Sequence, residues 1–230
     1  MADESHHATP PRRRDARRNR ELLVGAAREV FTELGLEAPL DVIARRAGVG
    51  NATLYRNFPT REALIDAVFH DVLTDTMAAG EQARAAADAW SALNGYLQAV
   101  FVTLAADRGT NDLMTTHLRG VEALEAVHAH NRQTVDVLLS RGREQGTVRA
   151  DVTTEDVLFS LAALGRAIPA LTAATTPEAW RRPLALFLDG LHASPATPPL
   201  PGSALTAAQL GYVLEDLGPH RMPRKGLTGE

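Results

Sequence analysis

The chain has 230 residues, 45% of them hydrophobic, which is enough to bury one large core or two smaller ones. The absence of cysteine excludes disulfide bonds and thiolate metal sites. The net charge of −4 is unevenly spread: residues 12–61 carry eleven arginines against six acids, and residues 62–230 carry thirteen basic against twenty acidic side chains. This asymmetry predicts a basic, nucleic-acid-binding head on an acidic body.

The sequence shows neither a signal peptide nor an apolar run of about 18 residues, the length needed to span a membrane. We therefore expect a soluble cytoplasmic protein, associated with the nucleoid and without membrane contact.

Residues 1–17 are predicted to form a disordered basic arm. Six arginines lie within residues 12–20, where they can neutralise phosphates and release counterions. A solvated arm without a partner would have the same composition. The motif that follows favours phosphate contact.

Two helices are predicted next. Apolar residues recur at helical spacing over residues 17–34, and Gly35 supplies a stop. Pro39 suits the first turn of a second helix, where a missing N–H does no harm, and this helix is expected to end near Ala47.

A helix-turn-helix follows from the next residues. Gly48 can adopt the left-handed conformation that ends the second helix. A third helix is expected from Asn51, as its N-cap, to Phe58, because Pro59 stops it. Such a short helix can project its polar face into the major groove of DNA. Thr60 then caps a longer helix that is expected to end near Gly80.

Within the third helix, side chains divide into packing and reading groups. Leu54 and Phe58 are four residues apart and are expected to pack on the first two helices. Tyr55 is either a packing residue or a DNA contact, and its polar neighbours favour contact. On the second helix, Arg45 and Arg46 are open to two interpretations: both are solvated, as arginines on helices often are, or one of them meets a phosphate.

Two stretches, VIARRAGV at residues 42–49 and ATLYRNFPTREAL at residues 52–64, match many positions of one sequence pattern in the same order. Together with the first helix they resemble the N-terminal domain of TetR-family transcriptional regulators over residues 18–77. The resemblance implies that Arg61 stands where the family usually places a phosphate-contacting lysine. It also implies a groove-facing set: Asn51, Ala52, Thr53, Tyr55, Arg56 and Asn57. The connection at residues 35–41 is one residue shorter than the commonest family spacing.

The body, residues 78–193, has the apolar stripes of an all-helical domain. Residues 138–157 resemble the ligand domain of SbtR-type TetR regulators, which implies a pocket among the middle helices. The candidates to line it, each of which could instead be an ordinary core or surface residue, are Tyr96, Phe101, Met114, His117, His128 and Asn131. His117 and His128 would lie about 16 Å apart along a helix, so we expect no metal site and no cofactor.

The last two body helices are apolar around most of their circumference, which indicates either a buried helix or a dimer interface. The family resemblance implies a homodimer built on these helices. The expected interface residues are Leu158, Leu161, Gly165, Phe187 and Leu191. Residues 194–230 are predicted to be a proline-rich linker and a short helix, from about Ala204 to Leu217, with a loose tail.

The sequence is thus expected to encode an all-α, two-domain regulator, most simply a homodimeric repressor released from a palindromic double-stranded DNA operator by an unknown small-molecule effector. One alternative is a helical sensing dimer that does not bind an operator. Another is a helical-bundle enzyme using Glu122, Glu125 and His128, although no nucleophile, phosphate loop or metal spacing supports it.

Overall fold

The computed structural model describes residues 11–116, 118, 120–194 and 198–217. This part of the chain is all-α, and its single β-type pairing is a bridge between Val148 and His192. The helices in chain order are α1 (Pro11–Leu34), α2 (Leu40–Arg46), α3 (Asn51–Asn57), α4 (Arg61–Ala85), α5 (Ala89–Ala106), α6 (Arg108–Thr115), α7 (Glu122–Glu144), α8 (Thr154–Ala174), α9 (Arg181–Leu191) and α10 (Ala207–Leu217).

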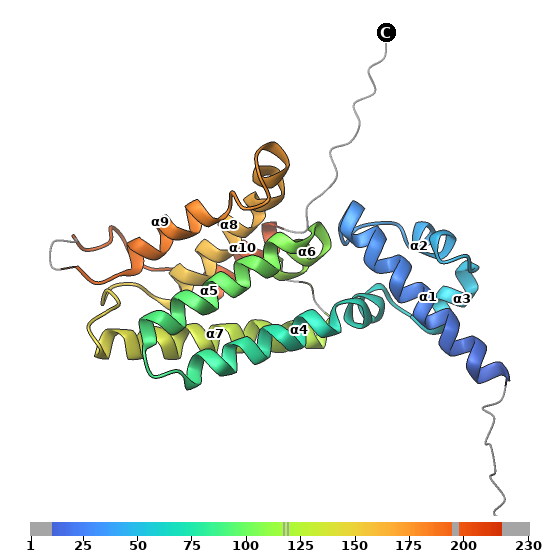
Figure 1. The fold of residues 1–230 in the computed structure, drawn as a ribbon, viewed down its shortest axis with the longest axis horizontal. Helices are drawn as coiled ribbons and strands as arrows, with labels where there is room; N and C mark the ends of the chain where they lie inside the picture. The colour runs from blue at the N-terminus through green and yellow to red at the C-terminus, as the bar shows by residue number, and fades with distance from the viewer. Residues whose placement is uncertain (1–10, 117, 119, 195–197, 218–230) are drawn as a thin grey trace, which may run out of the picture.

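The head consists of α1, α2, α3 and the start of α4, and it lies at one end of the molecule (Figure 1). The rings of Phe31 and Phe69 stack at its centre, with centroids 6.1 Å apart. Fully buried side chains from all four helices surround them: Leu23, Ala27, Val30, Ile43, Leu54, Phe58 and Leu64. Such a core fixes the short α3 on longer helices, because α3 alone is too short to be stable in water.

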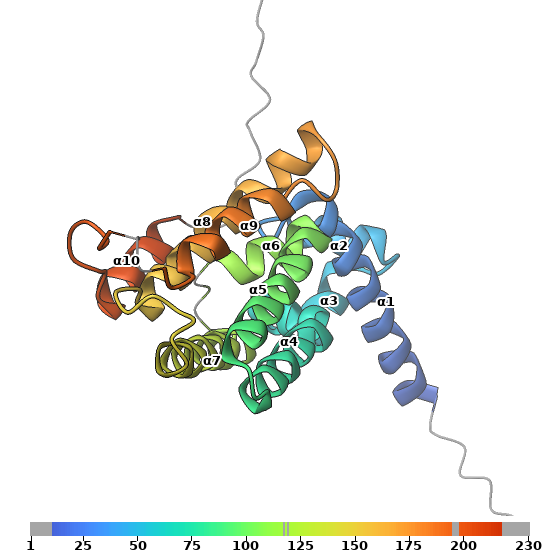
Figure 2. The same ribbon diagram turned by 60° about the vertical axis from the view of Figure 1, so that its left-hand side comes forward.

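The body is a bundle of the long helices α4, α5, α7, α8 and α9 (Figures 1 and 2). Helix α10 packs on α8 at the side of this bundle. The second core lies between these helices and includes Leu93, Leu97, Phe101, Val135, Leu138, Val157, Trp180, Leu184 and Leu188. The first core is not confined to the head, because it also contains Leu113 of α6 and Leu124 and Val127 of α7.

Helix α4 connects the two cores, and it is longer than predicted. Thr60 caps its start, since the Thr60 hydroxyl accepts a hydrogen bond from the Ala63 N–H at 3.1 Å. Gly80 does not end the helix, because α4 continues to Ala85. The glycine instead allows close packing: a Cβ there would lie 2.3 Å from Nε2 of His130 on α7.

A second contact between head and body joins α1 to α6. A Cβ at Gly109 would lie 2.9 Å from the carbonyl oxygen of Phe31, so α6 rests directly on the backbone of α1. Next to this contact, the Leu36 N–H donates to a carboxylate oxygen of Asp112 at 3.4 Å. The head is therefore held by the body at both α1 and α4.

The N-terminal prediction needs correction. Helix α1 begins at Pro11, so residues 11–17 are helical and not a disordered arm. Proline is well suited to the first helical position, and the Arg17–Glu21 pair at 2.9 Å supports the helix one turn later. Residues 1–10 lie outside the described part. At α3, Gly50 is the N-cap residue in place of the predicted Asn51, which is the first residue of the helix.

The starts of three body helices follow from local contacts and turns. Helix α6 starts at Arg108, where a carboxylate oxygen of Asp107 accepts the Thr110 N–H at 2.8 Å. Helix α9 starts at Arg181 after a turn that begins near Pro177. Helix α10 starts at Ala207.

Helix α8 is apolar enough to need explanation. By length and composition it could cross a membrane, with a mean hydropathy of 1.6 over 18 residues, contrary to the expectation that no such stretch is present. The helix packs against α5, α6, α7 and α10 within the bundle. The core helix of a soluble protein can have the same hydropathy. Within one chain, however, only 28% of these 18 residues are buried.

The α1–α6 contact yields a stability prediction. Gly109→Ala should lower the free energy of unfolding by about 1–3 kcal/mol, because the new methyl group must displace the backbone of Phe31. Gly95→Ala is the matched control, since Gly95 is exposed within α5 and its Cβ would meet no atom within 4 Å. The control should gain up to about 1 kcal/mol from helix propensity. Urea denaturation of both variants measures the difference, and equal stabilities would contradict the packing argument.

Candidate DNA-binding surface and ligand pocket

The turn between α2 and α3 has the geometry that the sequence predicts. Gly48 has a φ of 68°, in the left-handed region. Its N–H donates to the Arg45 carbonyl at 3.1 Å, and the Val49 N–H donates to the Ala44 carbonyl at 3.0 Å. These bonds satisfy carbonyls at the end of α2 that otherwise have no partner, and they fix the direction in which α3 leaves.

Helix α3 has one buried and one exposed side. Leu54 and Phe58 are each 1% exposed, and the guanidinium of Arg20 lies 4.4 Å above the Phe58 ring. The opposite side exposes Asn51, Ala52, Tyr55 and Arg56, whereas Thr53 and Asn57 are half-buried. Leu54 and Phe58 are therefore packing residues, as predicted, and DNA contact by the other side of α3 stays a prediction.

The polar side chains of α3 bond to their own helix in this structure. Arg56 donates from Nε to the Ala52 carbonyl at 3.2 Å and from Nη2 to the Thr53 hydroxyl at 3.0 Å. Asn57 donates from its amide to the Thr53 carbonyl at 2.8 Å. These donors face the exposed side of the head and can exchange an internal acceptor for a base or phosphate oxygen.

The two arginines of α2 differ in their surroundings. Arg45 is exposed and pairs with Asp41 on its own helix at 2.8 Å. Arg46 reaches α1, where it makes two hydrogen bonds to Glu33, at 2.6 and 2.9 Å, and approaches Glu29 at 3.7 Å. The bond from Arg46 lowers the pKa of Glu33. Arg46 thus ties α2 to α1, and Arg45 is the better placed of the two for a phosphate.

Arg61 has a structural task that the sequence did not indicate. Its Nη1 donates to the carbonyl oxygens of Leu36 at 2.7 Å and Ala38 at 2.8 Å. The side chain thereby joins the start of α4 to the short α1–α2 connection. Phosphate contact by Arg61 stays a prediction for its other N–H groups.

A cavity of about 320 Å³ lies in the body between α5, α6, α7, α8 and α10. Small-molecule sites span about 300–1,000 Å³, so this cavity is at the lower end of their range. Its walls are mainly apolar: Val100, Leu104, Met114, Leu158, Leu161, Leu210 and Leu214. Polar lining is confined to Thr115, Thr116, His128, Asn131 and Arg132.

Three predicted pocket residues line the cavity: Met114, His128 and Asn131. Tyr96 does not line it and lies behind Asn131, to whose side-chain oxygen its hydroxyl donates at 2.6 Å. Burial raises the pKa of Tyr96, so this hydroxyl keeps its proton. Phe101 is a core residue whose ring packs 6.0 Å from that of Trp180. His117 lies outside the described residues.

A polar cluster joins α4 to α7 beside Gly80. Arg84 donates from Nη1 to the Thr134 hydroxyl at 2.5 Å, and the same nitrogen lies 3.3 Å from Nε2 of His130. Burial and then the charge of Arg84 lower the pKa of His130, so the neutral imidazole is favoured there. Neutral His130 can accept a hydrogen bond from Arg84. Among the described residues, no three His, Asp or Glu side chains group as a metal site.

Comparison with known proteins identifies the class. A family model described as bacterial regulatory proteins, tetR family, matches residues 23–68, and one for the C-terminal domain of SbtR-like transcriptional regulators matches residues 88–193. The chain is 34% identical to a TetR transcription regulatory protein from Mycobacterium vanbaalenii, over 80% of this chain and 100% of that one, with a TM-score of 0.43. The chain belongs to the TetR family of transcriptional regulators.

Two further structures of transcriptional regulators are similar, the first of them from the TetR family. The regulator SCO0520 from Streptomyces coelicolor is 29% identical over 76% of this chain and 99% of its own, with a TM-score of 0.49. FadR from Bacillus subtilis, solved in complex with stearoyl-CoA, shares the fold at 18% identity over 75% of this chain and 99% of its own, with a TM-score of 0.56. A search of curated proteins found no match.

As a TetR-family member, the protein is a DNA-binding transcriptional regulator, and the enzyme alternative is excluded. The predicted SbtR-type body is confirmed. The matched regions end at residue 193, so α10 and its contribution to the cavity lie beyond them.

The expected dimer residues are mostly turned inward in this TetR-family chain. Leu161 and Leu191 are 8% and 4% exposed, and the Gly165 carbonyl accepts a hydrogen bond from the buried amide of Asn111 at 2.8 Å. These three residues pack inside their own domain, which corrects the prediction. Leu158 and Phe187 are half-buried.

The bonds of Arg61 yield the second prediction. Arg61→Ala should lower the free energy of unfolding by about 1.5–3 kcal/mol, because the carbonyls of Leu36 and Ala38 lose a charged donor. Arg45→Ala, on the exposed surface of α2, should change it by less than about 0.5 kcal/mol. Thermal unfolding of the DNA-free protein measures both. Equal melting temperatures would show that Arg61 has no structural role.

Proposed function

We propose that this TetR-family regulator is a homodimeric repressor that binds a palindromic operator with α3 and leaves it when a small molecule occupies the body cavity. The observation that carries the proposal is the exposed polar side of α3 on a fully packed head. A cavity in the same chain, lined by helices that also hold the head, supports effector control.

DNA binding is assigned to the exposed side of α3. Arg56 and Asn57 have the donors that match guanine and adenine edges, and Tyr55, 53% exposed, can contact backbone or base. Arg45 is the phosphate contact expected on α2. Arg17, Arg18 and Arg20 of α1 add positive charge to the head, where it can bind the phosphate backbone, and Arg20 lies over the Phe58 ring that follows α3.

Dimerisation is assigned to the outer side of α8 and α9. Phe159 is 39% exposed and Leu186 is 65% exposed, and Ala163 and Ala167 follow Phe159 at four-residue intervals along α8. Large exposed apolar groups aligned on one helix face are typical of an interface. Two copies would bring two heads to half-sites separated by ~34 Å or a multiple of it.

Effector control is assigned to two helices that border the cavity. Met114 and Thr115 of α6 line it, and α6 rests on α1 of the head at Gly109. His128 and Asn131 of α7 also line it, and α7 packs along α4. A ligand that favours a body geometry with wrongly spaced heads must weaken operator binding by the same factor by which DNA weakens ligand binding. Because the proposed partner is operator DNA, we place the protein in the cytoplasm, at the nucleoid.

Selection of bound sequences from random DNA tests the central proposal. The purified protein should enrich a near-palindromic sequence, and Arg56→Ala should bind that sequence about 1–3 kcal/mol more weakly if Arg56 contacts a base. Arg56→Lys is the matched control, because it keeps the charge without the planar donor pair. A uniform loss across all sequences would reassign Arg56 to phosphate contact. The absence of any enrichment would favour the sensing dimer without operator binding.

The interface has its own test. Phe159→Asp combined with Leu186→Asp should convert the dimer to a monomer at micromolar concentration, because the interface would bury unpaired carboxylates. Val102→Asp is the control, since Val102 is an apolar side chain on α5 that is 55% exposed. Sedimentation equilibrium gives the masses. A dimer that persists in the double variant would place the interface on another surface.

A further inference from the structure

Helix α10 has a side that faces the cavity and a side that faces solvent. Ala207, Leu210, Gly211 and Leu214 line the cavity, and their spacing places them on one face of the helix. Leu210 is 1% exposed, whereas Tyr212 on the other side is 79% exposed. The segment therefore packs as an amphipathic wall, although it lies outside the regions matched by the family models.

We propose that α10 completes the effector site, and that the site takes a neutral, largely apolar molecule that carries one oxygen acceptor. The proposal deepens the proposed function and rests on it, because it takes the body cavity as the effector site. It assigns ligand selection to a helix that is an addition to the SbtR-like body.

The ligand class follows from the lining. Leucine, valine and methionine side chains make up most of the wall, so most of the ligand must be apolar. Arg132 brings a positive charge, but it is paired with Glu155 at 2.5 Å, so this arginine offers no unpaired charge to an anionic ligand. Asn131 uses its side-chain oxygen to accept from Tyr96, which leaves its amide N–H groups to donate to an oxygen of the ligand.

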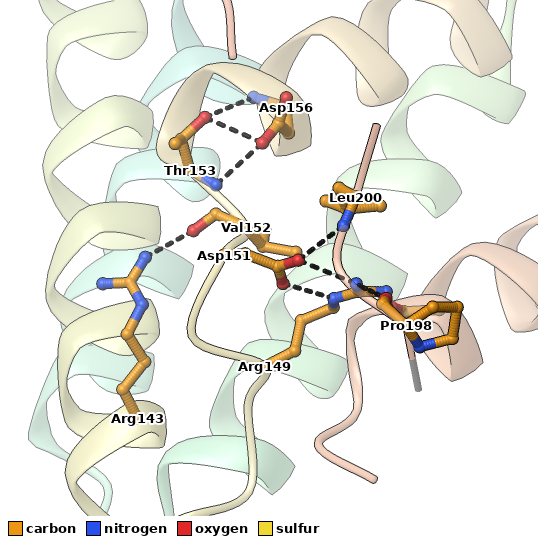
Figure 3. A network of polar contacts seen from close by, with 9 residues as sticks. Arg143, Arg149, Asp151, Val152, Thr153, Asp156, Pro198 and Leu200 are labelled. Atoms are coloured by element: carbon orange, nitrogen blue, oxygen red, sulfur yellow. Dashed lines mark hydrogen bonds and ion pairs between the residues drawn. The ribbon is translucent and has the colours of Figure 1, made fainter. Parts of the chain in front are cut away.

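The residues that lead into α10, Pro198 and Leu200, are hydrogen-bonded to the body (Figure 3). We call this group of bonds the anchor. Arg149 makes two bonds to the carboxylate of Asp151, at 2.6 and 2.9 Å, and donates to the Pro198 carbonyl at 2.9 Å. The Asp151 carboxylate also accepts the Leu200 N–H at 2.7 Å. Arg149 is nearly buried, with 10% of its side chain exposed.

This anchor is insensitive to pH near neutrality. The hydrogen bonds from Arg149 and then from the Leu200 N–H hold the pKa of Asp151 well below its usual value. A depressed carboxyl pKa contributes stability that is present above the unfolded pKa and lost only as the pH falls through the folded one. Six residues, 201–206, separate the anchor from α10, so the anchor limits how far the helix can move.

Gly211 offers a substitution that fills the cavity from α10. It lies on the cavity side, and its Cβ would meet no atom within 4 Å. The first carbon of a new side chain therefore meets no clash, and Gly211→Phe should direct its ring toward the cavity. The substitution also removes a glycine, which is unfavourable within a helix. Ala208→Phe is the matched control, since Ala208 is exposed on α10 and does not line the cavity. Ala162→Phe fills the same cavity from α8.

The probe is 6-propionyl-2-dimethylaminonaphthalene, a neutral naphthyl ketone whose fluorescence reports an apolar site; anilinonaphthalene sulfonate serves as the anionic comparison. The full-length protein should bind the ketone more tightly than the sulfonate. Gly211→Phe and Ala162→Phe should raise the Kd of the ketone by about tenfold or more, and Ala208→Phe should change it by less than about twofold. Circular dichroism confirms that each variant is folded.

The outcomes separate the two proposals. Loss of binding in Ala162→Phe but not in Gly211→Phe would overturn the role of α10 and leave the cavity as a ligand site. Unchanged binding in both variants would overturn the cavity itself. Preference for the sulfonate, or no binding of the ketone, would overturn the ligand class.

The dissociation rate of the ketone tests whether the anchor restrains α10. Asp151→Asn should increase the dissociation rate of the ketone by roughly several-fold, because the amide has only one acceptor oxygen and cannot accept from both Arg149 and the Leu200 N–H, which loosens the anchor ahead of α10. Glu178→Gln is the control: it removes an exposed pair with Arg181 at the start of α9, away from the cavity. Stopped-flow displacement gives both rates. An unchanged rate in Asp151→Asn would overturn the anchoring role.

Discussion

The close packing of α4 on α7 at Gly80 is the contact on which the rest of the structure depends. A Cβ there would lie 2.3 Å from Nε2 of His130 and 2.8 Å from the Thr134 hydroxyl, so a larger side chain would have to displace both of these groups. One turn further, Arg84 bonds to Thr134, and its own carbonyl accepts a hydrogen bond from Arg141 of α7 at 2.8 Å. The other end of α4 is buried in the head core. The position of α4 along α7 therefore determines the orientation of the head relative to the body.

The sequence predicted those features of the head that depend on neighbouring residues. Gly48 ends α2, Leu54 and Phe58 are buried, and α3 stops before Pro59, and each signal lies within a few residues of its effect. The partners of Arg46 and Arg61 are 13 and 25 residues away in the chain. A sequence does not distinguish a solvent-exposed arginine from one that bonds to a distant part of the chain. Only the tertiary structure shows that Arg46 and Arg61 are of the second kind.

The body was predicted in outline but not in orientation. Helix α8 is apolar around its circumference, so periodicity could not decide which side faced inward. The structure decides it through Gly165, where a Cβ would lie 2.9 Å from Thr115 and 3.0 Å from Leu104. The cavity was predicted only in part for a related reason. Its α10 wall follows a proline-rich linker, and nothing local in the sequence indicates where such a helix docks.

The two contacts that hold the head restrict how an effector can act. Helices α6 and α7 both border the cavity, α6 rests on α1, and α7 holds α4. Arg61 at the start of α4 is bonded to the connection between α1 and α2, so displacement of α4 is passed to α2 as well. Because α3 is fixed by the core that all these helices share, the head should turn as a unit. In the proposed homodimer, an effector should therefore change the spacing of two intact heads, so that ligand binding and operator binding compete without unfolding of α3.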